Sequence, residues 1–152
     1  MNLKNWQKNI LSAVVIAVGG FLLWNAAFIL AAVVMRVSSF VMGLSDDQGS
    51  GMIWKYLFLI VMLLISWLVF RAKRFKPLVK ATYLTMPLMA MLIIEGIQFY
   101  KQPQWVPISI GAAIVLVVLL YLYKKKLPWQ YYFASVYSGI VALLIVLLGI
   151  DI

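Results

Sequence analysis

The sequence predicts an all-α integral membrane protein, a bundle of five transmembrane helices with its N-terminus inside the cell and its C-terminus outside. Three observations predict it: the composition, the lengths of the apolar runs, and the placement of the cations. Of the 152 residues, 66% are hydrophobic and 11% are charged, whereas a soluble domain is about half apolar and a quarter charged. The length suits a single helical domain, residues 1–152, without a separate soluble part.

Five apolar runs define the expected helices. A helix needs about 20 mostly apolar residues to cross a hydrocarbon core of about 30 Å. Short polar or basic stretches separate the runs, and Pro107 opens the fourth as a favourable first helical residue. We therefore expect helices over residues 10–36, 52–70, 81–100, 107–123 and 128–150.

The first apolar run admits a second interpretation. Its basic start resembles a signal peptide, but a signal peptide has an apolar region of about 7–15 residues. The run from Ile10 to Met35 has 26, which favours a retained helix over a cleaved or peripheral segment and a four-span protein. Such a helix, at about 39 Å, exceeds the hydrocarbon core, and Gly19-Gly20 is where we expect a kink.

The cations fix the predicted orientation. Cytoplasmic loops of membrane proteins carry an excess of Lys and Arg. With the N-terminus inside, the outer side holds only Arg36, Lys55 and Lys101. The other ten of the 13 basic residues lie inside: Lys4, Lys8, Arg71, Lys73, Arg74, Lys76, Lys80, Lys124, Lys125 and Lys126.

Two helices carry small residues at helical spacing, a pattern that lets membrane helices approach closely. The alternative is that these residues are ordinary apolar filler. In the first helix the small residues are Ala13, Ala17, Gly20, Ala27 and Ala31, and in the fifth they are Ala134, Ser138 and Ala142.

Glu95 is the leading candidate for a functional site, because it is the only acid inside a predicted span. A carboxylate there is costly unless it is paired, protonated or hydrated. It lies about 14 residues, or about 21 Å, from the inner end of its predicted helix, in the outer half of the bilayer. Gln98 and Gln102 follow at i+3 and i+7 and would extend a polar ridge to the outer surface.

Three more residues are candidates for the same site. Asn25 lies at a depth similar to that of Glu95, while Arg36 and Lys55 lie further out on the same side. Pairing of Glu95 with either cation is geometrically allowed. These residues together predict a polar pocket that opens outward and binds a ligand or a proton.

Two further features have competing interpretations. Pro87 removes a backbone hydrogen bond and is expected to bend its helix, which with Thr82 and Thr85 would open a polar pocket, unless the proline serves packing alone. Asp46 and Asp47 lie in a Gly/Ser loop without the spacing of a calcium site, which favours a solvated turn over a cation site.

The chain contains no Cys and no His, which excludes thiolate and imidazole chemistry and the usual zinc ligands. No phosphate-binding glycine loop or nucleophile elbow is present, and the predicted inner face carries cations only. We therefore predict no enzymatic activity, no cofactor and no bound metal.

The net charge of +9 does not indicate nucleic-acid binding, because the cations lie in short loops and not on a helix face. These cations are suited to binding anionic lipid headgroups. The sequence is compatible with a homo-oligomer or with membership of a larger membrane complex. The short loops and Met/Ile-rich helices are typical of a bacterial cytoplasmic membrane. The lipid-binding candidates are Arg71, Lys73, Arg74, Lys76, Lys124, Lys125 and Lys126.

Two functions fit these observations. The first is a transport-related or ligand-binding role centred on Glu95. The alternative is a non-catalytic accessory or scaffold subunit of a membrane complex, packed through the small-residue faces of the first and fifth helices.

Overall fold

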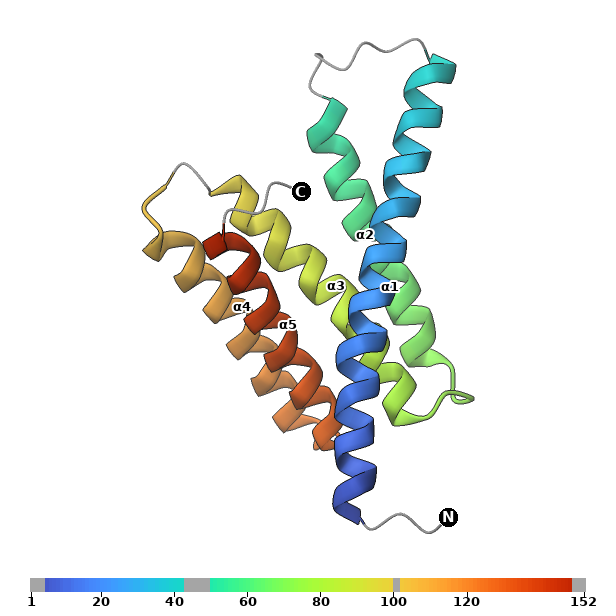
Figure 1. Ribbon diagram of the computed structural model, residues 1–152, viewed down its shortest axis with the longest axis vertical. Helices are drawn as coiled ribbons and strands as arrows, with labels where there is room; N and C mark the ends of the chain where they lie inside the picture. Colours follow the sequence, from blue (N-terminus) through green and yellow to red (C-terminus); the bar gives the residue numbers. More distant parts are fainter. Residues whose placement is uncertain (1–4, 43–49, 100–101, 149–152) are drawn as a thin grey trace.

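The computed structural model describes residues 5–42, 50–99 and 102–148, and this part of the chain forms five α-helices (Figure 1). The all-α prediction is confirmed. Successive helices run in alternating directions, so the start of α1, the α2–α3 connection and the α4–α5 connection lie at one end, the lower end in Figure 1. The helices are α1 (Asn5–Met42), α2 (Ser50–Arg71), α3 (Pro77–Gln98), α4 (Trp105–Lys124) and α5 (Trp129–Leu148).

Length and composition indicate a membrane protein. Three helical stretches are long and apolar enough to cross a bilayer: Asn5–Val34, Pro77–Gln98 and Trp105–Lys124. Tyr56–Arg71 and Trp129–Ile145 form two shorter apolar stretches. The crossing of the bilayer by all five helices stays a prediction.

Helix α3 is the centre of the bundle. It packs against each of the other four helices, and Figure 1 shows it between the α1–α2 pair and the α4–α5 pair. The five consecutive residues from Met86 to Ala90 are all buried, so α3 is enclosed on every side over this turn. A helix enclosed in this way holds its side chains in fixed positions relative to all four neighbours.

Helices α1 and α3 approach closely at a pair of glycines. A Cβ at Gly20 would lie 3.0 Å from Cβ of Thr85, and one at Gly19 would lie 3.2 Å from Cγ2 of Thr82. Helix α1 continues through these glycines without interruption, and the kink expected there stays a prediction. The missing side chains of the glycines allow the close contact with α3.

Pro87 is accommodated by a hydrogen bond from a neighbouring helix. A proline at this position cannot donate to the carbonyl four residues earlier, which belongs to Tyr83. The hydroxyl of Ser66, on α2, donates to that carbonyl at 3.3 Å. Helix α3 therefore continues through Pro87 with the carbonyl satisfied by α2. The hydroxyls of Thr82 and Thr85 donate to carbonyls of their own helix, and the polar pocket expected there stays a prediction.

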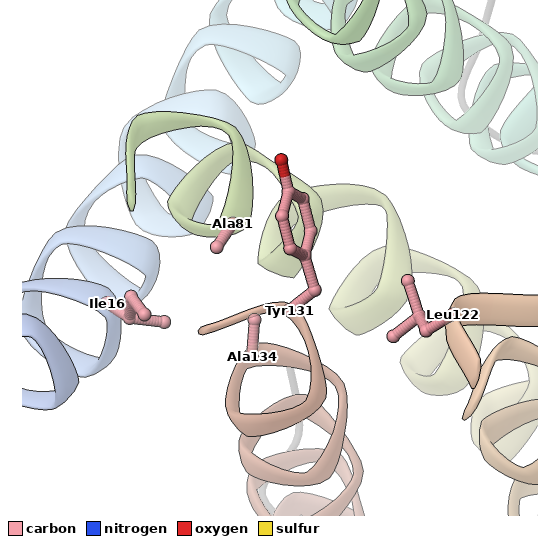
Figure 2. Packing of buried hydrophobic residues seen from close by; sticks show 5 residues of the cluster. All are labelled: Ile16, Ala81, Leu122, Tyr131 and Ala134. Carbon is pink, nitrogen blue, oxygen red and sulfur yellow. The ribbon is translucent and has the colours of Figure 1, made fainter. Parts of the chain in front are cut away.

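One buried cluster joins the helices near the end that holds the α2–α3 and α4–α5 connections. In Figure 2 the side chains of Ile16, Ala81 and Ala134 gather in the space between α1, α3 and α5. The ring of Tyr131 lies beside them and packs on Phe70 of α2, with 5.7 Å between the ring centroids. Residues from all five helices thus meet at this level.

The α4–α5 turn closes with a Schellman motif. The N–H of Leu127 donates to the carbonyl of Leu122 at 3.2 Å, and that of Lys126 donates to Tyr123 at 3.0 Å. Lys126 adopts a left-handed conformation with φ of 49°, where glycine is the usual residue. Leu127 also packs against the cluster that contains Leu122, so the turn is anchored in the core.

The start of α3, predicted at residue 81, is observed at Pro77, and α1 differs more, since it spans Asn5–Met42 where residues 10–36 were predicted. The prediction placed the start of α3 at the start of the apolar run, which begins only after Lys80, and so it left out the first turn. The Lys80 ammonium donates to the carbonyl of Phe70 at 2.8 Å, so this cation satisfies the end of α2 from within α3. Proline at the first helical position was the available signal.

Candidate functional site

A cavity of about 490 Å³ lies between α3, α4 and α5. We call it the Glu95 cavity. Its walls are Leu92 and Glu95 of α3, residues of α4 from Pro107 to Leu116, and residues of α5 from Val136 to Leu144. Among the described residues that line it, Glu95 carries the only polar side chain. The site is therefore one carboxyl group in an aliphatic cavity.

The carboxyl group of Glu95 lacks a hydrogen-bond partner at one of its oxygens. Oε1 is buried, and the described part of the chain offers it no partner. Oε2 lies 3.7 Å from where a Cβ on Gly111 would be, so the missing side chain of Gly111 gives the carboxyl group its room beside α4. A buried acceptor without a hydrogen bond is destabilising.

The true start of α3 changes the depth of Glu95. It lies 18 residues after Pro77 and three before Gln98, which places it about 27 Å along the helix and within one turn of its end. The sequence-based depth of about 21 Å was too small because it began at residue 81. Glu95 thus lies close to the end of the bundle that is predicted to face outward.

Gln98 faces a different neighbour from Glu95. The hydroxyl of Tyr56, on α2, donates to Oε1 of Gln98 at 3.3 Å, whereas Glu95 faces α4. Helix α3 ends at Gln98, so Gln102 lies in the following connection. The predicted polar ridge is therefore not continuous in the structure.

The other residues expected around Glu95 are placed elsewhere. Asn25 donates its side-chain amide to the carbonyl of Phe21 in its own helix at 2.8 Å. Arg36 is exposed on α1, and neither Asn25 nor Arg36 lines the Glu95 cavity as described. The side chain of Lys55 lies outside the described residues, so its pairing with Glu95 stays a prediction.

The small residues of α1 and α5 lie within the bundle to different degrees. On α5, Ala134 and Ser138 are fully buried and Ala142 nearly so, and Ser138 donates to the carbonyl of Ala134 at 2.8 Å. On α1, Gly20 and Ala27 are buried, whereas Ala13, Ala17 and Ala31 are half-buried. These positions contribute to the packing of this chain's own helices.

Sequence reasoning missed the part that α4 and α5 play in the site. Gly111 makes room for the Glu95 carboxyl group, and Gly139 lets α4 approach α5, since a Cβ there would lie 3.1 Å from Val115 Cγ2. The small residues Gly111, Ala112 and Ala113 near the start of α4 were the available signal. Their relation to Glu95 required the three-dimensional packing.

The cations of the two predicted inner connections are exposed. Arg71, Lys73, Arg74 and Lys76 project from the α2–α3 connection, and Lys124 to Lys126 from the α4–α5 turn. The Arg71 guanidinium lies 5.3 Å from the centre of the Trp67 ring, an arrangement that favours a cation–π contact. Their binding to anionic lipid headgroups stays a prediction.

The Glu95 cavity offers chemistry suited to binding. Its carboxyl group can accept hydrogen bonds, hold a proton or pair with a cation, and aliphatic walls surround it. The described residues contain no group of three or more acids that would hold a metal ion, and Asp46 and Asp47 lie outside them. Comparisons with protein-family models, with curated proteins and with solved structures find no match.

Proposed function

We propose that this chain is a multi-spanning protein of the bacterial cytoplasmic membrane that binds an apolar ligand in the Glu95 cavity, in a transport-related or ligand-binding role. The observation that carries the proposal is the side chain of Glu95, which lines a cavity with otherwise aliphatic walls and whose buried Oε1 has no partner among the described residues. A carboxyl group within a membrane-spanning segment is costly and marks a functional site by default.

The arrangement of the helix ends supports the proposed orientation. The two basic connections and the start of α1 share one end of the molecule (Figure 1). The positive-inside rule assigns this end to the cytoplasm. Glu95 then lies near the outer surface, within reach of ligands in the outer half of the bilayer.

The scaffold alternative, in which the small-residue faces of α1 and α5 bind a partner or pack the bundle, is supported for packing only. Ala13, Ala17 and Ala31 of α1 are half-buried, whereas Ala134 and Ser138 of α5 are fully buried and are not accessible to a partner. Their contacts are already made within the chain. The ligand-binding proposal, by contrast, uses a cavity and a carboxyl oxygen that the intramolecular contacts leave unfilled.

Filling the cavity tests the proposal. A leucine at position 111 would occupy the space beside Glu95, whereas an alanine would meet Leu92 Cδ2 at 3.6 Å and Glu95 Oε2 at 3.7 Å, which are ordinary contacts. We expect a photoreactive long-chain alkyl probe, with the protein in phosphatidylcholine nanodiscs, to label α4 and α5 in the wild type and in Gly111→Ala. Labelling in Gly111→Leu should fall by about tenfold or more.

Peptide mapping by mass spectrometry locates the label. Equal labelling of Gly111→Leu and wild type at these helices would show that the probe contacts only the lipid-facing surface, and would refute the proposed site. The unfolding transition of each variant, followed by circular dichroism, controls for loss of fold.

A further inference from the structure

The one polar side chain of the Glu95 cavity, among the described residues that line it, lies between apolar lining on its outer and inner sides. Helix α4 runs from the predicted outer end inward and α5 runs outward (Figure 1). Pro107 and Leu144 therefore mark the outer end of the cavity, and Leu116 and Val136 mark its inner end. The stretch from Pro107 to Leu116 covers about 14 Å of helix, and the Glu95 carboxyl group lies beside Gly111 in this stretch.

The wall chemistry restricts the polar group of a ligand. The only polar side chain among the described lining residues is the carboxyl group of Glu95, and charge-assisted N–H bonds to a carboxylate are stronger than neutral ones. The described lining residues include no aromatic side chain, so no aromatic cage is present to hold a quaternary ammonium. These two features favour an ammonium group that retains N–H donors.

The cavity also opens toward the lipid-facing side of α4 and α5. Ile108 and Leu116 on α4, and Val136 and Ile140 on α5, line it and are exposed on the described bundle. An aliphatic chain therefore has a route into the cavity from the acyl region of the bilayer, without first passing through water.

We propose that the Glu95 cavity takes a single-chain aliphatic amine, with its ammonium group on the Glu95 carboxylate near the outer surface and its chain running inward between α4 and α5. This assignment rests on the proposed function and names its ligand class. The charge on Glu95 selects the head, and the aliphatic groove that continues inward from it selects the tail.

A set of matched photoreactive probes tests the class. Dodecylamine, dodecanol and dodecyltrimethylammonium, each with a diazirine on the chain, are compared at equal membrane concentrations in phosphatidylcholine nanodiscs. We expect the amine to label α4 and α5 with an apparent affinity about ten- to a hundredfold above that of the other two probes. Glu95→Gln should reduce amine labelling to the level of the alcohol.

A matched control separates the carboxyl group from general polarity near the outer end. Gln98 contacts α2 through Tyr56 and does not line the cavity, so Gln98→Ala should leave amine labelling as in the wild type. The unfolding transition of each variant shows whether the fold is kept. Loss of amine selectivity in Gln98→Ala, with the fold intact, would contradict the assigned role of Glu95.

The outcomes distinguish this inference from the proposed function. Equal labelling by amine and alcohol, both blocked by Gly111→Leu, would keep the cavity as a binding site and overturn the amine assignment. Labelling insensitive to Gly111→Leu for every probe would overturn both. Displacement of the amine by a small fraction of phosphatidylethanolamine would identify a two-chain lipid as the occupant and overturn the single-chain assignment.

Discussion

The contribution of the hydrogen bond from Ser66 to the Tyr83 carbonyl to the free energy of unfolding should depend on Pro87. In the wild type this hydroxyl replaces the backbone N–H that proline lacks, so Ser66→Ala leaves the carbonyl without that donor. We expect a loss of about 1 kcal/mol in the free energy of unfolding, within the range for hydrogen bonds in proteins and membrane bundles. Ser66 is buried, so water does not readily replace the lost donor.

The Pro87→Ala background should remove most of this effect. An alanine at position 87 supplies an N–H to the Tyr83 carbonyl, and Ser66→Ala should then cost about 0.3 kcal/mol or less. The double-mutant cycle therefore predicts a coupling of about 0.7–1 kcal/mol between Ser66 and Pro87. The effect of Pro87→Ala alone does not enter this value, because the cycle subtracts it.

Equilibrium unfolding in mixed micelles with increasing dodecyl sulfate, followed by tryptophan fluorescence and circular dichroism, provides the four free energies. Ser135→Ala is the matched control. Its hydroxyl is also buried and donates to a carbonyl, that of Tyr131, at 2.9 Å, but α5 already supplies a backbone donor there. It should cost less than about 0.5 kcal/mol. If the effects of Ser66→Ala and Pro87→Ala on the free energy of unfolding were additive, the Ser66 hydroxyl would not replace the N–H that Pro87 lacks.

Three further substitutions test the packing and the helix ends by the same unfolding measurement. Gly20→Ala should destabilise the bundle by about 1–3 kcal/mol because its methyl group meets Thr85, and Thr85→Ala in the same chain should recover part of that loss; a neutral Gly20→Ala would contradict the close approach. Lys126→Gly should stabilise the protein by about 1 kcal/mol, since glycine adopts a positive φ without strain, whereas a loss would show that the turn does not need this conformation. Lys80→Met should cost about 1 kcal/mol by removing the donor to Phe70, and Lys76→Met, exposed in the same connection, should cost little.

The candidate site was only partly predictable. Glu95 stood out because an acid inside an apolar run is costly in any arrangement. Its predicted neighbours Asn25 and Arg36 were chosen by depth alone, and depth leaves open the direction in which a side chain points around the helix axis. The structure directs Glu95 toward Gly111 of α4, a residue whose only signal was its small size.

The close helix contacts were also only partly predictable from the sequence. The sequence marked Gly20 and Pro87 as special, each for a local reason: a missing side chain and a missing N–H. It did not identify Thr85 or Ser66 as their partners, because both partners lie on other helices and their identity depends on how those helices are packed.

The sequence by itself determined the class of the protein, the number of helices and the exceptional character of Glu95, because these follow from composition, run length and the cost of a buried charge. Only the tertiary structure decided which face of each helix points inward and which helices share the Glu95 cavity. The physical reason is that lipid and protein interior are both apolar. Helices that are hydrophobic on all sides therefore carry little local information about their neighbours.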